Sequence, residues 1–490
     1  MSRGPDRRPV EHRLHDDVPT VDAEAAAAAL DPDATVLTSG FGSVGYPKAI
    51  PLALASSPRG LSLTLVASGN VGDEIDVDLV ESGAVERRFS YQSSRVARDL
   101  TNRREVSFSD RNASSIGDEV QHGGMVDPDV AIVEAVAVGE DWFVPSTSLG
   151  QVPAFVEAAD RLYVELNRRQ PLELQALHDI YRPDAPPNRD PVPISDPGER
   201  IGTTHVSFDP EKLAGVVETD IADSTYTFRD PTDDDLAIAE NLGAFLDAEM
   251  ERSPVFEDAV HLQFGVGSLG NALMGELKEL DFGGRDVVYF GELIQDGLLD
   301  MLDDGRLECA SATSMALTDE GQQRLFENVE RYAEDVVLRP ADVSNHPGVI
   351  DQFGVVGVNS AIEFDIYGNV NSTHVGGKQM INGVGGSADF NRNSLVTVCA
   401  LPSALKGGEV SRVVPMTFHV DHTEHDVDVF VTEQGVADVR GLSPVERAER
   451  IIENCAHPEF APELRSYLDD VREQDNHIPH DVQRAAEWHE

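Results

Sequence analysis

Apolar runs of strand length alternate with helix-like segments through the first half of this 490-residue chain. The strand-like runs end at glycine, serine or acidic turns and cover residues 35–45, 61–68, 130–138 and 161–167. The helix-like segments between them cover residues 46–57, 76–88 and 151–159. Because the strand-like runs lack regular polar alternation, they fit a parallel sheet that helices cover on both faces.

The second half repeats this alternation after a polar interval. Residues 181–200 are dense in proline and residues 218–235 are acidic, so both are predicted to be connections. Beyond them, strand-like runs are expected at 259–267, 285–292, 356–371, 394–402, 412–420 and 427–435. Helices are expected at 235–250, 271–280, 293–305 and 440–456. We therefore predict an α/β protein with two Rossmann-like domains and parallel-rich sheets, the N-terminal domain at 1–225 and the C-terminal domain at 226–490.

The charge of the chain argues against several classes of partner. Asp and Glu number 88 against 38 Lys and Arg, which gives a formal net charge of −50 at pH 7. Such a surface repels phosphate backbones and anionic lipid, so we expect no nucleic-acid or membrane partner. No apolar stretch is long enough to span a membrane, and the N-terminal arginines are not followed by the apolar segment of a signal peptide. Together with three widely spaced cysteines and no CxxC pair, this predicts a cytoplasmic protein.

Lysine usage indicates a saline environment. Only five of the 38 basic residues are lysines, namely Lys48, Lys212, Lys278, Lys378 and Lys406. An acidic surface that avoids lysine favours a halophilic protein, because abundant cations screen its self-repulsion. The alternative is an acidic protein from a mesophile that lives at ordinary salt concentrations. Each remaining lysine is a candidate for a specific role, unless it has survived by chance.

A glycine-rich segment, Gly265-Val-Gly267-Ser268-Leu269-Gly270-Asn271, lies between a predicted strand and a predicted helix. Glycines let the backbone approach a phosphate, and free N–H groups at a helix start attract the anion. On the motif alone this is a candidate dinucleotide-binding turn, with Glu292 at the end of the next strand in the place of a ribose-binding carboxylate. A tight turn that binds nothing is the alternative.

Two further segments offer groups for catalysis. In the stretch that begins at Asn382, Gly385 and Gly386 can direct backbone N–H groups toward an oxyanion, with an ordinary turn as the alternative. Glu292 ends a predicted strand, which places its carboxylate at the carboxyl edge of a sheet, where α/β proteins bind ligands. A helix N-terminal acid, stabilised by the helix dipole, is the alternative for Glu292.

The stretch His419-Val-Asp421-His422-Thr-Glu424-His425-Asp426 has the composition of a metal site. It lacks the HExxH and HxxEH spacings, however, and along a continued strand its three histidines face in alternating directions. We therefore expect no metal here and interpret the stretch as a polar strand end and turn with a structural hydrogen-bond network.

Segments spread from about residue 35 to residue 460 match, in order, those of one known family. They include GYPKAIPLALA (45–55), YQSS (91–94), EDWFVPSTSLG (140–150), VELN (164–167), HDIY (178–181), VVETD (216–220), GELIQDGLLDMLDDG (291–305), ASATS (310–314), FDIYGNVNSTHVGG (364–377), NGVGGSADFNRN (382–393) and VVPMTFHVDHTEHDVDVFVTEQGVADVRGLSP (413–444). The chain thus resembles the acetyl-CoA hydrolase/transferase family, the class I CoA-transferases that include succinyl-CoA:acetate and 4-hydroxybutyrate CoA-transferases. The resemblance implies two α/β domains of the CoA-transferase type.

The resemblance also implies a mechanism. Glu292 corresponds to the family's nucleophile, which attacks an acyl-CoA thioester to give a mixed anhydride and then a glutamyl-CoA thioester. Asn345 and the backbone N–H of Gly386 correspond to the oxyanion stabilisers, and Glu433 to a glutamate that orients the site. The His419–Asp426 stretch belongs to the family pattern, which further disfavours a metal.

Contacts to coenzyme A are implied for a set of residues from the C-terminal domain, namely Gly267, Ser268, Leu269, Gly270, Asn271, Asn382, Gly386 and Lys406. The ammonium of Lys406 is a point charge suited to the CoA phosphates. Lys48 is either structural or part of the acyl site. Residues 42–44 depart from the family pattern, so acyl size is not inferred from them.

We therefore expect a homodimeric enzyme that moves CoA between an acyl-CoA and small carboxylates such as acetate, propionate and succinate. No permanently bound cofactor is expected, because CoA is itself the cosubstrate. Hydrolysis of acyl-CoA at the same site is the nearest alternative. A nucleotide-dependent oxidoreductase and a CoA-binding regulator without activity are the alternatives from other classes.

Overall fold

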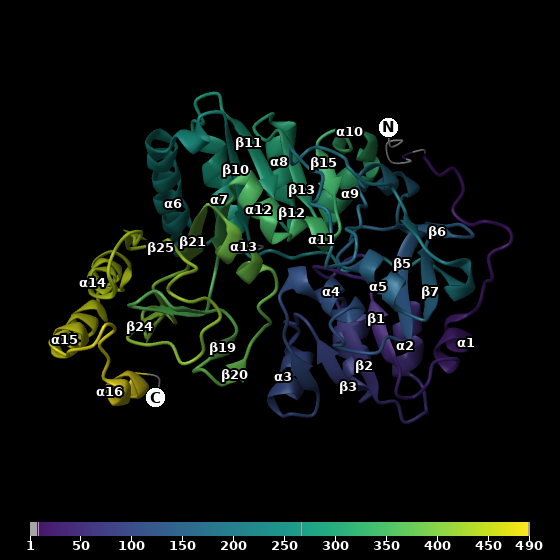
Figure 1. Cartoon of the computed structure of the whole chain (residues 1–490), viewed down its shortest axis with the longest axis horizontal. Helices are drawn as coiled ribbons and strands as arrows, with labels where there is room; N and C mark the ends of the chain where they lie inside the picture. Colours follow the sequence, from purple (N-terminus) through teal and green to yellow (C-terminus); the bar gives the residue numbers. More distant parts are fainter. Residues whose placement is uncertain (1–6, 8, 266, 489–490) are drawn as a thin grey trace. The chain divides into compact units, whose positions relative to one another are not determined.

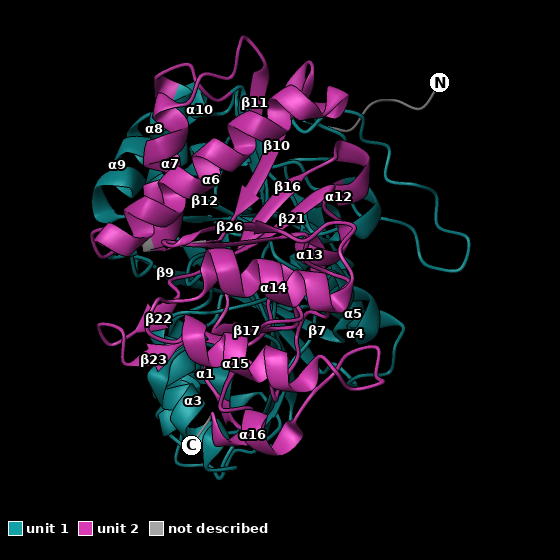
Figure 2. Cartoon of the chain, turned by 90° about the vertical axis from the view of Figure 1, so that its left-hand side faces the viewer, with its two compact units in different colours: residues 1–227, 289–302, 308–349 teal, residues 228–288, 303–307, 350–490 magenta. Residues whose placement is uncertain are grey.

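The computed structural model describes residues 7, 9–265 and 267–488, and of Ser268 it describes the backbone. These residues form two compact units, coloured separately in Figure 2. Unit 1 comprises residues up to 227 together with 289–302 and 308–349, and unit 2 comprises 228–288, 303–307 and the residues from 350 onward. The predicted domain division after residue 225 stays a prediction, since the units exchange segments after Thr227.

Unit 1 is built on a parallel sheet with the strand order β4-β3-β2-β1-β5-β7-β9 (Figure 1). These strands are β1 (Thr35–Thr38), β2 (Leu63–Ala67), β3 (Val85–Phe89), β4 (Ser107–Ser109), β5 (Val130–Val138), β7 (Arg161–Asn167) and β9 (Leu213–Thr219). Strands β6 (Trp142–Pro145) and β8 (Val206–Ser207) extend the sheet antiparallel from β5. Every residue of β5 is buried, as expected of a strand covered on both faces.

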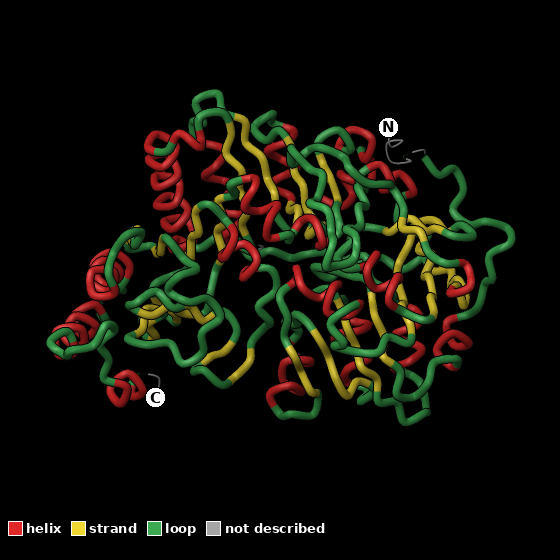
Figure 3. The backbone as a smooth tube through the Cα atoms, viewed as in Figure 1, coloured by secondary structure: helices red, strands yellow, loops and turns green. Residues whose placement is uncertain are grey.

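The helices among these strands are short, and Figure 3 shows how they alternate with the strands. They are α1 (Ala23–Ala28), α2 (Ala49–Ala55), α3 (Arg95–Asn102), α4 (Ile116–Gln121) and α5 (Val152–Ala158). The helix expected at 76–88 is wrong in its second half. Residues 74–79 form a π-helix, Gly83 has a φ of 77° that ends the turn, and Val85–Phe89 pair with β2 instead. Buried Val85 and Phe89 are spaced i, i+4 and fit either period, so the pairing with β2 and not the local pattern places them in the sheet.

The later segments of unit 1 bring in a second group of strands and helices. They are β12 (Leu293–Gln295), α8 (Asp296–Asp303), β13 (Cys309–Ala312), β14 (Ser314–Ala316), α9 (Asp319–Glu327), α10 (Val329–Tyr332), β15 (Val336–Leu338) and α11 (Ala341–Ser344). Strand β12 runs parallel to β14, and β13 runs parallel to β15. The helix expected at 293–305 therefore begins only at Asp296, after a strand.

Unit 2 has its own sheet segment with the order β10-β16-β21-β25-β26, in which only β26 is antiparallel to its neighbour. The strands are β10 (Ala259–Phe264), β16 (Val356–Asn359), β21 (Val396–Ala400), β25 (Val429–Thr432) and β26 (Gly435–Asp438). Its helices are α6 (Asp233–Arg252), α7 (Ser268–Glu279), α13 (Ser387–Asn393), α14 (Pro444–Cys455), α15 (Ala461–Val471) and α16 (Val482–Glu487). Strand β11 (Asp286–Phe290) and helix α12 (Pro347–Phe353) carry the chain between the units.

Short strands complete unit 2. They are β17 (Glu363–Asp365), β18 (Val370–Asn371), β24 (Val413–Val414) and the two hairpins β19 (His374–Val375) with β20 (Gln379–Met380) and β22 (Ala404–Leu405) with β23 (Val410–Ser411). The strand expected at 412–420 is confined to Val413–Val414, because Pro415 has no N–H to continue the ladder. Phe418 and Val420 are consequently 40% and 45% exposed.

Two helices of unit 2 begin at capping boxes. At α6 the Thr232 hydroxyl accepts from the backbone N–H of Asp235, whose carboxylate accepts from the backbone N–H of Thr232. Ser443 and Glu446 form the same box at α14. Such a box satisfies two of the N–H groups that a helix start leaves unpaired.

Each unit has a separate apolar core. In unit 1, side chains from β1, β2, β3 and β5 pack against α1, α2 and the π-helix. In unit 2, side chains of β25 and of the β17–β18 region pack against α14 and α15. The three cysteines, Cys309, Cys399 and Cys455, are buried and free. Neither core depends on a disulfide.

Salt is expected to stabilise this fold. The net charge of −50 places carboxylates close together, and cations screen their repulsion over a Debye length of about 10 Å at 0.1 M. Going from dilute buffer to molar KCl should raise Tm by several degrees, since 1 kcal/mol corresponds to about 2–4 °C in domains of 150–250 residues. Circular dichroism melts test this, with sucrose as a control for general solute effects. A Tm that does not rise with KCl rules out the high-salt interpretation.

Candidate active site

Glu292 lies in the short link between β11 and β12, within unit 1. The backbone around it is fixed by hydrogen bonds to the neighbouring strand region, since the N–H of Gly291 donates to the carbonyl of Ser311 over 3.0 Å. The carbonyl of Glu292 accepts from the N–H groups of Thr313 and Ser314, both at 3.1 Å. The Glu292 side chain is half-buried. Because these hydrogen bonds restrain the main chain at the strand end, the Glu292 carboxylate is held in a defined position.

Tyr289 folds back over this link. Its hydroxyl oxygen accepts from the backbone N–H groups of Leu293 and Glu292, and burial followed by the charge of Glu292 raises the pKa of the phenol. A Cβ at Gly291 would lie 2.6 Å from the Tyr289 hydroxyl, so only glycine fits at this position. The sequence pattern shows Tyr289 as one more buried strand residue, and no signal in it reveals this second role.

Asn345 is the direct partner of the Glu292 carboxylate. Its Nδ2 donates to Glu292 Oε1 over 2.9 Å. The hydroxyl of Ser344 donates to Asn345 Oδ1 over 2.9 Å, which fixes the amide so that its NH2 faces the carboxylate. The structure thus brings together two of the site residues predicted from the sequence, both in unit 1.

Helix α11, whose C-cap is Asn345, is anchored at several points within unit 1. The N–H of Ala341 donates to the carbonyl of Gly150 over 2.8 Å. The guanidinium of Arg182 binds the buried carboxylate of Asp342 over 2.8 Å, and the buried Arg339 donates to the hydroxyl of Ser311 over 2.9 Å. Asn345 is therefore presented by a rigid support rather than by a mobile loop.

Two buried tyrosines are coupled electrostatically to the site, Tyr91 to Glu292 and Tyr226 to Tyr91. Burial, followed by the negative charge of Glu292, raises the pKa of Tyr91 to about 12. Burial, followed by Tyr91, raises the pKa of Tyr226 to about 12, and Tyr226 also has a hydrogen bond with Ser43. Tyr91 belongs to the YQSS segment, but the sequence reasoning assigned it no role. Both phenols remain protonated at neutral pH and can act as hydrogen-bond donors.

The glycine-rich turn at 265–271 lies in unit 2 and starts α7. Gly267 is the N-cap of the helix with a φ of 137°, a conformation that favours glycine, and the N–H of Asn271 donates to its carbonyl over 2.9 Å. A Cβ at Gly265 or Gly267 would meet no atom within 4 Å, so packing does not require glycine there. Gly270 is buried, whereas Leu269 is only half-buried. The side chain of Ser268, one of the predicted CoA contacts, lies outside the described part of the structure.

The second glycine-rich segment is also in unit 2. Gly386 is the N-cap of α13, and Gly385 before it has a φ of 58°. The Asn382 amide donates to the carbonyls of Ser372 and Gly383 at 3.0 and 2.9 Å, which ties this segment to the strand region at 370–375. The backbone of Gly386 is therefore held at a helix start, as an N–H donor to an anion requires.

Glu433 binds Ser403 in unit 2, three residues before Lys406 in the chain. The Glu433 carboxylate accepts from the N–H of Ser403 over 2.7 Å and from the Ser403 hydroxyl. Burial works to raise the pKa of Glu433, but these hydrogen bonds outweigh it and keep the pKa below its ordinary value. Ser403 leads into the β22–β23 hairpin, where Lys406 is exposed and has a φ of 53°, unusual for a residue other than glycine.

The His419–Asp426 stretch forms turns and not a strand. His419 Nε2 contacts Asp421 over 3.1 Å, and its ring lies 4.0 Å from the ring of His374, centroid to centroid. His422 is buried, with a pKa lowered to about 4 mainly by burial, and its Nε2 lies 3.3 Å from the hydroxyl of Ser387. His425 is exposed and faces Glu424. The three histidines thus have different partners, as expected for a structural network.

Lys48 occupies the interior of unit 1. Its Nζ is fully buried and contacts Glu134 at 2.5 Å and Asp223 at 2.8 Å. Of the two alternatives left open by the sequence, this favours the structural one.

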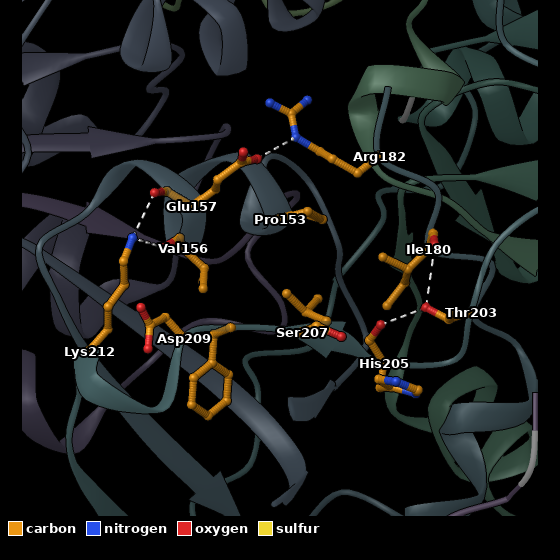
Figure 4. Close-up of a pocket in the computed structure, with 12 residues that line it drawn as sticks. Pro153, Val156, Glu157, Ile180, Arg182, Thr203, His205, Ser207, Asp209 and Lys212 are labelled. Carbon is orange, nitrogen blue, oxygen red and sulfur yellow. Dashed lines mark hydrogen bonds and ion pairs between the residues drawn. The ribbon is translucent and has the colours of Figure 1, made fainter. Parts of the chain in front are cut away.

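A pocket with a volume of about 440 Å³ lies elsewhere in unit 1 (Figure 4). Its cations are already paired, since Lys212 donates to the carbonyl of Glu157 over 2.7 Å and Arg182 binds Asp342. None of the site residues predicted from the sequence lines it. Among the described residues, ligand atoms of three potential metal ligands converge within 4.8 Å only at exposed His15, Asp17 and Glu140. No helix in the described part of the chain is both long and apolar enough to cross a membrane.

Comparisons with known proteins match both halves of the chain to the same family. The model of the acetyl-CoA hydrolase/transferase N-terminal domain matches residues 19–218, and that of the C-terminal domain of the same family matches residues 321–468. The chain is 40% identical over 475 residues to the succinyl-CoA:acetate CoA-transferase of Clostridium kluyveri, covering 96% of this chain and 88% of that protein. It is 37% identical to the propanoyl-CoA:succinate CoA transferase of Escherichia coli, covering 95% and 96%. It is 36% identical to the acetyl-CoA hydrolase of Schizosaccharomyces pombe, covering 88% and 85%.

Solved structures share the fold. RipA from Yersinia pestis superposes with a TM-score of 0.71 at 21% identity, over 91% of this chain and 96% of that one. The 4-hydroxybutyrate CoA-transferase of Porphyromonas gingivalis gives a TM-score of 0.62 at 20% identity, over 92% and 97%. The predicted fold of two α/β domains of the CoA-transferase type with parallel-rich sheets is confirmed.

Proposed function

The chain belongs to the acetyl-CoA hydrolase/transferase family, and we propose that it moves CoA between an acyl-CoA and a short-chain carboxylate such as acetate, propionate or succinate. The observation that supports this most is the amide of Asn345, which lies 2.9 Å from the carboxylate of Glu292. A carboxylate that becomes an acyl carrier needs a fixed hydrogen-bond donor at one oxygen. The other oxygen can then act as the nucleophile.

The first half-reaction begins with attack by Glu292. A carboxylate oxygen forms a bond to the thioester carbonyl carbon, the C–S bond breaks, and CoA leaves as a thiolate with the electron pair. The product on the enzyme is a mixed anhydride between Glu292 and the acyl group. No proton has to be transferred, because nucleophile and leaving group are both anions.

The thiolate then attacks the carbonyl carbon of Glu292 itself. The acyl group leaves as a free carboxylate, and a glutamyl-CoA thioester remains. Negative charge develops on the glutamyl oxygen during this attack, and the Asn345 amide at 2.9 Å supplies a donor for it. In our proposal the backbone N–H of Gly386 is the second donor. An incoming carboxylate reverses both steps and leaves as the new acyl-CoA, which gives ping-pong kinetics.

Coenzyme A is the cosubstrate in this scheme, and residues of unit 2 are proposed to bind it. Gly267 to Asn271 start the twelve-residue helix α7, whose N–H groups attract phosphate. Asn382 and Lys406 complete the proposed contacts. Glu433 is proposed to orient the segment after β21 through its two hydrogen bonds with Ser403.

Replacing Lys406 by alanine should raise KM for acyl-CoA by about tenfold to a hundredfold, because one charge-assisted contact to a phosphate is lost. KM for the carboxylate and kcat at saturation should change little. Steady-state kinetics with each substrate varied in turn measure this. Lys378→Ala is the matched control, since Lys378 is also an exposed lysine between the strands of a hairpin. A change confined to the carboxylate KM contradicts the assignment.

Hydrolysis is the second candidate, and several relatives named acetyl-CoA hydrolase favour it. Water would then attack the anhydride or the glutamyl-CoA thioester in place of a carboxylate. Purified protein in high salt is incubated with acetyl-CoA or succinyl-CoA and a panel of carboxylates. New acyl-CoA indicates transfer, free CoA alone indicates hydrolysis, and NAD binding without either points to the oxidoreductase alternative.

A homodimer in the cytoplasm is part of the proposal. Light scattering of the purified protein in high salt tests the assembly, and a monomer mass contradicts it.

A further inference from the structure

The loop Gly40–Pro47 lies directly against the Glu292 segment within unit 1. A Cβ at Gly42 would come within 2.5 Å of Leu293 Cδ2, so the backbone of the loop touches the residue that follows Glu292. The hydroxyl of Ser314 donates to the carbonyl of Phe41 over 2.6 Å, while the N–H of Ser314 donates to the carbonyl of Glu292 over 3.1 Å. Ser314 therefore joins the loop to the nucleophile's own peptide unit.

This loop has an unusual backbone. Gly40, Gly42, Ser43 and Gly45 have φ values of 118°, 67°, 60° and 65°. Ser43 is not a glycine, so its left-handed conformation costs energy that the surroundings have to offset. A loop of this kind keeps one conformation only where several groups hold it.

The holding groups come from a buried cluster beneath the loop. The Asp223 carboxylate accepts from the N–H of Gly45 at 3.2 and 3.3 Å. The Lys48 ammonium donates to the carbonyl of Tyr46 over 2.8 Å, and the hydroxyl of Ser39 donates to the carbonyl of Gly45 over 2.8 Å. The side chains of Asp223, Lys48 and Ser39 thus form hydrogen bonds with two successive loop residues, Gly45 and Tyr46.

The cluster is ionic and fully enclosed. The Lys48 ammonium forms ion pairs with Glu134 at 2.5 Å and with Asp223 at 2.8 Å, and none of the three side chains has any exposed area. Glu134 also accepts from the Ser146 hydroxyl at 2.6 Å and the Asn167 amide at 2.9 Å. Burial is the main cause that raises the pKa of Glu134, to about 7. Buried ion pairs of this kind often stabilise a fold no more than apolar side chains of equal volume would.

A third carboxylate beside the cluster has a separate task. Glu165 accepts from the N–H groups of Lys48, Ala49 and Ile50 at 2.7, 3.0 and 2.6 Å, at the start of α2. Its charge is satisfied by that helix start. Lys48 is therefore left to balance Glu134 and Asp223, of which Asp223 binds the loop at Gly45.

We propose that Lys48 and Asp223 are positioning residues of the Glu292 site, which hold the loop Gly40–Pro47 against Leu293 and Ser314 so that the Glu292 carboxylate stays aligned with Asn345. This inference rests on the proposed function of Glu292 as the nucleophile. A positioning role predicts that the cluster acts on kcat through the loop, while CoA binding, assigned to unit 2, is unaffected.

A double-mutant cycle tests the proposal. One change is the pair Lys48→Met with Asp223→Asn, which removes one charge of each sign; the other is Ser314→Ala, which cuts the link between loop and Glu292 without touching a charge. We expect each change to lower kcat for CoA exchange by about tenfold, with KM for acyl-CoA within about twofold. Because both release the same loop, the combination should lower kcat by about tenfold as well, and not by about a hundredfold.

Two further variants keep the test decisive. If the Lys48/Asp223 variant does not fold, Ser39→Ala replaces it, since this removes a loop contact without a charge. Arg440→Met, which breaks an ion pair with Glu249 at 3.0 Å in unit 2, is the control for losing an ion pair and should lower Tm while leaving kcat unchanged. Two results overturn the positioning role. One is a decrease in kcat for the combined variant that equals the product of the two separate decreases, and the other is a lower Tm of the variants with a wild-type kcat. A wild-type protein without exchange, hydrolysis or a labelled Glu292 refutes the proposed function first, and the inference with it.

Discussion

Glu292→Gln is expected to abolish both CoA exchange and acyl-CoA hydrolysis, with a loss on the order of 10⁴-fold or more, as for other enzymes deprived of their nucleophile. The amide has nearly the volume of the carboxylate and can still accept from Asn345, but it is a far weaker nucleophile. In wild-type protein treated with acyl-CoA, borohydride should reduce the glutamyl-CoA thioester to an alcohol. Hydroxylamine should convert the same thioester to a hydroxamate. Peptide mass spectrometry detects both products.

Controls for this experiment separate chemistry from folding. Tm and CoA affinity of Glu292→Gln should stay close to wild type, since the side chain is half-buried and glutamine can keep the hydrogen bond from Asn345 Nδ2. Glu292→Asp retains the charge but shortens the reach, and it should be nearly as inactive because the Asn345 donor no longer lies at the reacting carbonyl. An unmodified Glu292 peptide in active wild-type protein would falsify the covalent mechanism.

Asn345→Ala is expected to lower kcat by about 10²- to 10³-fold, the usual effect of removing one oxyanion donor. KM for acyl-CoA should remain within a few-fold, because the donor acts on charge that develops only during the reaction. Rapid-quench measurement of the borohydride-sensitive thioester shows whether its formation is the slowed step.

A variant of the neighbouring Ser344 probes the orientation of the Asn345 amide. Ser344→Ala removes the hydroxyl that donates to Asn345 Oδ1, so the amide loses the contact that fixes it, and a smaller decrease in kcat is expected. Asn345→Asp places a second carboxylate against Glu292 and should be at least as damaging as alanine, because like charges at this distance oppose each other. Wild-type kcat in Asn345→Ala contradicts the role of the amide.

The α/β class could be predicted because the central strands are continuous apolar runs. The run at 130–138 corresponds residue for residue to the fully buried strand β5. Where the pattern was mixed, as at 76–88, the pairing of Val85–Phe89 with β2 decided the structure, and no local signal contains that information. The same limit applies to the compact units, because contacts between distant segments determine which residues cluster.

The candidate site, too, could be predicted from the sequence only in part. Glu292 could be placed at a strand end from the pattern alone, but its partner Asn345 lies 53 residues further along the chain, and only the family resemblance pointed to it. Tyr289 was not predictable as a support, since a buried tyrosine in a strand looks like core, and for Lys48 the sequence left a structural role and the acyl site as alternatives. Their roles arise from a hydroxyl turned toward two backbone N–H groups and from an ammonium enclosed by carboxylates.

Because the three cysteines are buried, the release of coenzyme A can be measured with a thiol reagent. Cys309, Cys399 and Cys455 are at most 7% exposed, and burial raises the pKa of each thiol to about 12. Thiolates are the species that react with aromatic disulfides and maleimides, so the folded enzyme should be almost silent toward such reagents. A colorimetric thiol reagent in the cuvette therefore counts released coenzyme A and little else. Hydrolysis can be recorded continuously in this way, and the slow appearance of protein thiols in the same trace reports unfolding.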